Sequence, residues 1–147
     1  HDDEDSRYID KQAIMNIKNI KDMDYFGNVD NIKDIIISSK CVILPTYYNE
    51  GVPRILIESL ALGRPIITTD LPGCNETILE GKTGYFVKPK NVDDLKVKMI
   101  KMVNLEPNSY IKMTKYCRKH AETFFSDEKI IQRYKSLADS LNNDWDN

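Results

Sequence analysis

The chain has 147 residues, of which 41% are hydrophobic and 30% are charged, so its length and composition fit one globular domain rather than a disordered segment. Its 21 Lys and Arg residues against 23 Asp and Glu residues give a formal charge of −2, which provides no general basic field for nucleic acid. The sequence contains no apolar run approaching the roughly 18 residues that a transmembrane helix needs.

The cysteine pattern argues against a zinc site and against a disulfide framework. Cys41, Cys74 and Cys117 lie far apart, form no C-x-x-C pair, and are accompanied by one internal histidine, His120. Reduced thiols of a cytoplasmic protein fit this pattern best. The acidic, polar first residues do not resemble a signal peptide. Because His1 stands where an initiator methionine would, we expect either that the chain has been processed or that it is a piece of a longer protein.

The first part of the chain predicts two helices and two short strands. Apolar residues at helical spacing predict a helix over residues 6–20, and residues 24–27 are expected to form a short strand that ends at a glycine. Residues 30–39 predict an amphipathic helix. The continuous apolar run at residues 41–44, stopped by Pro45, predicts a strand of a parallel sheet that is buried on both faces.

The middle of the chain repeats this alternation. Pro53 suits the first position of a helix, which we expect to end at Gly63. Residues 65–69 predict the next strand, residues 75–79 a short helix, and residues 85–87 a last strand.

From residue 91 the pattern becomes helical. Three helices are predicted, the third over residues 127–141 with Ser126 as its N-cap. The apolar faces of the first two comprise Val92, Leu95, Met99, Met102 and Val103, and then Met113, Tyr116, Cys117, His120, Ala121 and Phe124. The whole pattern predicts an α/β fold: a Rossmann-like parallel sheet with helices on both faces, ending in two or three helices. Ligands of such sheets bind at the carboxyl ends of the strands, so the loop after Leu44 is where we expect a site.

Two glutamates flank the start of the helix that Pro53 opens. Glu50 lies in the loop, and Glu58 lies eight residues further along, on the helix. Free N–H groups and the positive end of the helix dipole favour a phosphate there, and Gly51 allows a close approach to the backbone. A carboxylate on the helix can accept hydrogen bonds from two ribose hydroxyls. Spacing alone favours a simpler interpretation, in which Glu50 complements the dipole and Glu58 is a solvated helix residue.

Several other candidates have simple structural explanations. Residues 81–83 end like a P-loop but lack its first glycine and precede a strand, so we expect a turn. Glu76 follows a strand end and either faces the same cleft or is exposed. Arg54 lies in the first turn of its helix, where a cation is disfavoured, which suggests a ligand or an acidic partner. We expect His120 to be packed in the core, and Cys74 has no base to activate it.

An ordered set of sequence blocks is more specific than any of these motifs. The blocks are residues 25–29, 42–46, 50–70 and 72–76, followed by Gly81, Gly84 and Pro89. Together they strongly resemble the C-terminal, donor-binding domain of retaining GT-B glycosyltransferases of family 4, whose E-x7-E motif corresponds to Glu50 and Glu58. The resemblance covers residues 22–141. Its Glu-Gly-x-Pro-Arg variant is similar to bacterial enzymes that build surface polysaccharides, lipid-linked oligosaccharides or protein glycans.

The resemblance implies roles for individual residues. Glu50 would be catalytic and contact the transferred sugar, and Glu58 would bind the ribose of the nucleotide. The sugar and the β-phosphate would be held by the backbone around Gly51, Val52, Pro53 and Arg54. The nucleotide base would lie over Gly27, Asn28 and Val29.

The resemblance also implies a reaction. A hexosyltransferase-type enzyme would move a sugar from a nucleoside diphosphate sugar to an acceptor hydroxyl with retention of configuration, without a metal or other cofactor. Two alternatives remain open at this stage: a non-catalytic nucleotide-sugar-binding module of the same fold, and a GT-B sugar-nucleotide epimerase. We expect no nucleic-acid partner, and a location in the cytoplasm or at the cytoplasmic face of the membrane, with peripheral membrane association of the parent left open.

The family pattern has parts that this sequence lacks. An Arg/Lys pair that clamps the diphosphate, and a whole N-terminal domain that binds a saccharide or lipid-linked acceptor, would precede His1. We therefore expect residues 1–147 to form a single truncated domain that is inactive by itself. Residues 127–141 would form a helix that packs on the missing N-terminal domain.

Overall fold

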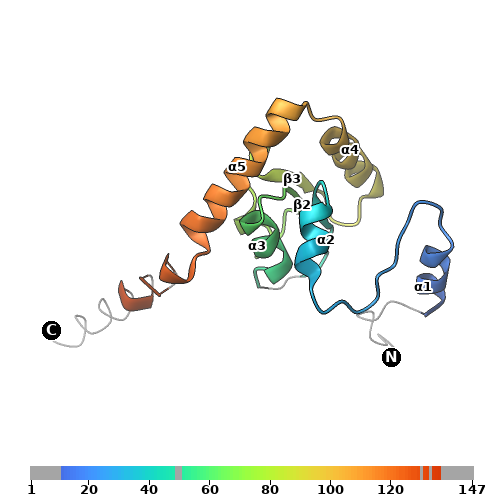
Figure 1. The fold of residues 1–147 in the computed structure, drawn as a ribbon, viewed down its shortest axis with the longest axis horizontal. Coiled ribbons are helices and arrows are strands. Elements are labelled where there is room, and N and C mark those ends of the chain that lie inside the picture. Colours follow the sequence, from blue (N-terminus) through green and yellow to red (C-terminus); the bar gives the residue numbers. More distant parts are fainter. Residues whose placement is uncertain (1–10, 49–50, 130, 133, 137–147) are drawn as a thin grey trace. The chain divides into compact units, whose positions relative to one another are not determined.

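The structure, a computed structural model, describes residues 11–48, 51–129, 131–132 and 134–136 (Figure 1). The chain forms two compact units, residues 1–32 and residues 33–147. The described part of the first unit contains helix α1 (Lys11–Lys18), after which residues 24–27 have an irregular backbone. The strand predicted there is wrong: a strand needs a neighbour to hydrogen-bond with, and none pairs with residues 24–27 in the described part of the chain.

The second unit is built on a parallel three-stranded sheet. The strands are β1 (Val42–Leu44), β2 (Ile66–Thr69) and β3 (Gly84–Val87), in the order β1-β2-β3. Val42 is in register with Ile66, and Ile66 with Gly84. The predicted parallel α/β fold is confirmed. Every residue of the central strand β2 is buried, whereas β1, at the edge of the described sheet, is only half-buried, so the complete burial expected for β1 is not observed.

Helices cover the sheet on both faces (Figure 1). Helix α2 (Ile32–Ser38) leads into β1, and α3 (Arg54–Ala61) connects β1 to β2. The 3₁₀ helix η1 (Asn75–Thr77) is shorter than predicted. Helices α4 (Val92–Val103) and α5 (Pro107–Phe124) follow β3; α4 packs on β2 and β3, while α5 packs on α3.

The predicted ends of α3 are close to those observed. Pro53 is the N-cap rather than the first helical residue. At the other end Gly63 has a φ of 68°, its N–H donates to the Leu60 carbonyl, and the N–H of Arg64 donates to the Ser59 carbonyl. These two bonds form a Schellman motif, which needs a left-handed residue and therefore favours glycine.

The core lies between the sheet and the α3–α5 pair. Its fully buried side chains include Leu56, Leu60, Ile66, Ile67 and Cys117. Of the third predicted helix, residues 127–129, 131–132 and 134–136 are helical, and residues 137–141 lie outside the described residues. This core fixes α3 against the sheet and thereby sets the position of its N-terminus.

Candidate functional site

The carboxyl ends of the three parallel strands lie at one edge of the sheet, and the loops that follow them form the candidate site. β1 ends at Leu44, β2 at Thr69 and β3 at Val87. The Thr69 hydroxyl donates a hydrogen bond to the Thr46 carbonyl, which ties the loop after β1 to the end of β2. Open α/β sheets bind ligands at this edge.

The N-terminus of α3 opens at this edge. Pro53 provides no side-chain cap, and the first turn of the helix contains no acidic residue. The leading N–H groups of a helix have no acceptor within the helix and carry its positive partial charge. A methyl group placed on the exposed Gly51 would meet no atom within 4 Å, so a ligand has room to approach the backbone there. This arrangement suits an anion.

Glu58 lies one turn along α3 from Arg54, on the same side of the helix. Arg54 Nε donates to Glu58 Oε1 at 2.6 Å, and the Arg54 side chain is 90% exposed while that of Glu58 is 33% exposed. The acidic partner expected for Arg54 is therefore Glu58 itself. An exposed i,i+4 pair of this kind contributes only about 0.3–0.5 kcal/mol, so a ligand that offers Glu58 two hydroxyl donors can compete with it.

The remaining predicted site residues divide into two groups. Glu50 lies outside the described residues. Gly27, Asn28 and Val29 belong to the first unit, where Gly27 has a φ of 65° and all three residues are exposed. The structure thus brings together Gly51, Val52, Pro53, Arg54 and Glu58, and the role predicted for residues 27–29 stays a prediction.

Sequence reasoning missed an aromatic and basic cluster at the same edge. The rings of Tyr47 and Tyr48 have centroids 4.4 Å apart, with Tyr48 donating to the Tyr47 hydroxyl at 3.2 Å. The ammonium of Lys90 stands 4.7 Å from the centroid of the Tyr47 ring. The signal available in the sequence was a lysine that follows a predicted strand end.

The other residues considered from the sequence have structural roles. His120 is buried between Phe124 and Phe125, and burial lowers its pKa. Cys74 is buried, and Glu76 lies exposed on η1. Burial also raises the pKa of Cys117 to about 12, so that its thiol is not reactive.

The described part of the chain shows neither a metal centre nor a membrane span. Among its residues, no three His, Cys, Asp or Glu side chains are grouped so as to hold a metal ion. Nor is any helix in the same residues long and apolar enough to cross a bilayer.

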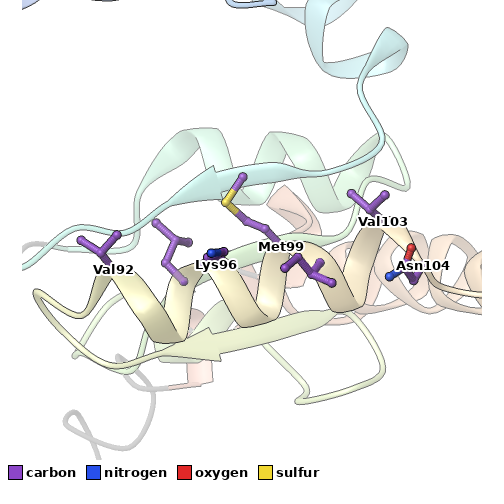
Figure 2. Close-up of a pocket in the computed structure, with 7 residues that line it drawn as sticks. Val92, Lys96, Met99, Val103 and Asn104 are labelled. Carbon is purple, nitrogen blue, oxygen red and sulfur yellow. The ribbon is translucent and has the colours of Figure 1, made fainter.

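A hollow lies on α4. It has a volume of about 470 Å³ and is lined by Val92, Leu95, Lys96, Met99, Ile100, Val103 and Asn104. Figure 2 shows Val92, Met99 and Val103 projecting from the same side of the helix. Five of the seven lining residues are apolar, and a nucleotide needs several converging polar groups, so this hollow does not fit one.

Comparison with known proteins gives consistent results. The model of the family "Glycosyl transferases group 1" matches residues 3–122. An N-acetylgalactosaminyltransferase of Campylobacter jejuni that acts on N,N'-diacetylbacillosaminyl-diphospho-undecaprenol is 31% identical over 118 residues, which are 80% of this chain and 30% of that protein. The capsular polysaccharide biosynthesis glycosyltransferase CapM of Staphylococcus aureus is 28% identical over 85% of this chain and 30% of its own length.

Solved structures agree with the fold. A glycosyltransferase from Rickettsia africae superposes with a TM-score of 0.77 at 26% identity, over 86% of this chain and 34% of that one. Anabaena HepE in complex with UDP-glucose superposes with a TM-score of 0.72 at 15% identity, over 90% of this chain and 35% of that one. The chain thus spans about a third of the length of the proteins that it matches.

Proposed function

Because the chain belongs to the group 1 glycosyl transferase family and has a GT-B type fold, we propose that it is the donor-binding domain of a retaining, family 4 type glycosyltransferase. The whole protein would transfer a hexose from a nucleoside diphosphate sugar to an acceptor hydroxyl, in bacterial surface polysaccharide or glycan synthesis. The observation that carries this proposal is the open N-terminus of α3 at the carboxyl edge of the sheet, with the Glu58 carboxylate on the same helix.

The geometry supports a defined placement of the donor. The diphosphate would lie against the leading N–H groups of α3, where the dipole stabilises negative charge. The ribose hydroxyls would donate to Glu58, replacing its bond to Arg54. Glu50, as the catalytic carboxylate, would face the transferred sugar.

In the proposed reaction, the bond between the anomeric carbon and the diphosphate oxygen breaks, and the diphosphate leaves with the electron pair. The acceptor oxygen forms the new bond to the anomeric carbon and loses its proton to the departing phosphate. The transition state has oxocarbenium character. Donors fixed before the reaction stabilise the developing charge of the leaving group, so the proposal requires no metal and no cofactor.

The parts outside this chain complete the proposal. Residues 1–147 would be one truncated domain, inactive alone, with residues 127–141 packing on an acceptor-binding domain. A saccharide or lipid-linked acceptor would bind there, at the cytoplasmic face of the membrane or in the cytoplasm. The relatives reported above carry transferase names, so they do not favour the epimerase alternative.

The test is donor kinetics on the whole polypeptide that contains this domain. We expect release of nucleoside diphosphate from at least one donor of a nucleotide-sugar panel, and Glu58→Ala should raise the donor KM at least about tenfold, since two hydrogen bonds to a charged group are lost. Glu50→Ala should lower kcat.

A matched control is available on α5. Glu122 Oε1 accepts from Arg118 Nε at 2.6 Å, the same i,i+4 geometry as the pair on α3. Glu122→Ala breaks this equivalent ion pair away from the site and should leave the donor KM unchanged. Turnover that is insensitive to both Glu50→Ala and Glu58→Ala would contradict the proposed function.

A further inference from the structure

The loops after β1 and β3 meet across the end of a strand that separates them. β2 lies between β1 and β3 in the sheet, yet Lys90 from the loop after β3 places its ammonium 4.7 Å from the ring centroid of Tyr47, in the loop after β1. The two loops therefore close over the carboxyl end of β2, at the edge where α3 begins.

The backbone around Lys90 is held in a specific conformation. Lys90 has a φ of 54°, a left-handed conformation that is uncommon for a residue with a side chain. The N–H of Lys88 donates to Asp94 at 2.8 Å, and the Asn91 side chain caps α4 by accepting from the Asp94 N–H at 2.9 Å. These bonds hold the turn between β3 and α4, so the backbone from which the Lys90 side chain projects is set by the fold.

Arg54 and Lys90, two cations at this edge, differ in whether a carboxylate already neutralises them. Arg54 is paired with Glu58 at 2.6 Å. Lys90 has no carboxylate of the described residues within ion-pair distance, and its charge rests on the face of an aromatic ring. An exposed cation–π contact contributes only about 0.5–1 kcal/mol, whereas a charge-assisted hydrogen bond to a phosphate is stronger.

We propose that Lys90 is a binding residue for the diphosphate of the donor, and that Tyr47 holds its ammonium in place until the donor arrives. This inference rests on the proposed function and adds a residue to it. A diphosphate carries several negative charges, and the N-terminus of α3 supplies only about half an elementary charge. On binding, the ammonium of Lys90 moves from the ring to a phosphate oxygen and compensates part of the remainder.

The test compares the affinity of uridine diphosphate with that of uridine monophosphate, measured by NMR titration of the whole polypeptide that contains this domain, up to millimolar nucleotide. Uridine nucleotides are the first probes because one structural neighbour, HepE, was solved with UDP; guanosine and adenosine diphosphates follow in the same panel. Lys90→Gln should raise the Kd of the diphosphate about tenfold and that of the monophosphate less than about threefold.

Two further variants separate charge from structure. Lys90→Arg keeps the charge and should stay within about threefold of the wild type. Lys88→Gln removes an exposed lysine from the same turn and should leave the Kd of the diphosphate unchanged. This variant controls for the overall positive charge of the loop. Loss of the Lys90–Tyr47 contact on binding should also shift the ring-proton signals of Tyr47.

The outcomes are distinguishable. A wild-type whole polypeptide that binds no nucleoside diphosphate contradicts the proposed function itself. Binding by the wild type that Lys90→Gln leaves unchanged, or that Lys88→Gln weakens as much, overturns only the role of Lys90. Equal weakening of diphosphate and monophosphate likewise overturns the role of Lys90 at the second phosphate, and a tenfold loss in Lys90→Arg rules out a role that depends on its charge.

Discussion

The contact between β2 and β3 at Gly84 predicts a severe effect of a single methyl group. A Cβ at this position would lie 1.8 Å from the Ile66 carbonyl oxygen and 2.8 Å from its carbonyl carbon. Side-chain carbons do not come closer than about 3 Å to such atoms, so the two strands would have to part by about 1 Å. Both strands belong to the core sheet, where residues 66 and 84 are paired in register.

The expected cost is large because backbone, rather than a flexible side chain, must move. Overpacking a core by one or a few carbons costs about 1–3 kcal/mol when side chains can shift. Alanine also makes unfolding less favourable entropically, by about 0.4–1 kcal/mol. We therefore expect Gly84→Ala to lower the free energy of unfolding by about 2–3 kcal/mol, measured by urea denaturation followed by circular dichroism.

Gly81 provides the matched control. It has a φ of 73°, but a Cβ there meets nothing within 4 Å. Gly81→Ala should cost about 1 kcal/mol, the left-handed strain less the entropic gain. If Gly84→Ala were no more destabilising than Gly81→Ala, the close approach of the two strands would be refuted.

Three further predictions concern titration, reactivity and metal. Burial lowers the pKa of His120, so the folded state disfavours its protonation. The free energy of unfolding should therefore fall as the pH drops below the unfolded-state pKa of about 6.5. Measured as the urea midpoint at pH 7.5 and at pH 5.5, this loss of stability should be smaller in His120→Phe. The pKa of Cys117 is about 12 and its side chain is buried, so a thiol reagent should label Cys41 first and Cys117 only at the rate of unfolding, as followed by mass spectrometry. Transferase activity of the whole protein should be undiminished in excess chelator, and its abolition would contradict the metal-independent mechanism.

Local sequence signals predicted most of the second unit. Pro53 and Gly63 bracket α3 because one has no N–H to lose at a helix start and the other adopts the left-handed conformation at a helix end. The four β-branched residues of β2, two isoleucines and two threonines, favour a strand, and all four are buried. These features depend on a few neighbouring residues, which a single sequence displays.

Features that depend on distant partners were not predictable in this way. Residues 24–27 have a strand-like pattern but no paired neighbour among the described residues. Their spacing in the sequence placed Val92 and Val103 on the apolar face of α4, yet these side chains are 78% and 65% exposed. The spacing of apolar residues identifies one face of a helix, but it does not show how much of that face the rest of the protein covers. The Lys90–Tyr47 contact joins loops that only the sheet order brings together.

The most direct test of the donor site is an amide chemical-shift map of the whole polypeptide that contains this domain, titrated with uridine diphosphate and the other nucleoside diphosphates. We expect the largest changes at the amides of Gly51, Arg54 and Ile55 and in the signals of Glu58, because the phosphates would bind the start of α3 and the ribose would displace Arg54. Changes confined to the α4 hollow, or no changes at millimolar concentration of any nucleotide, would contradict the account.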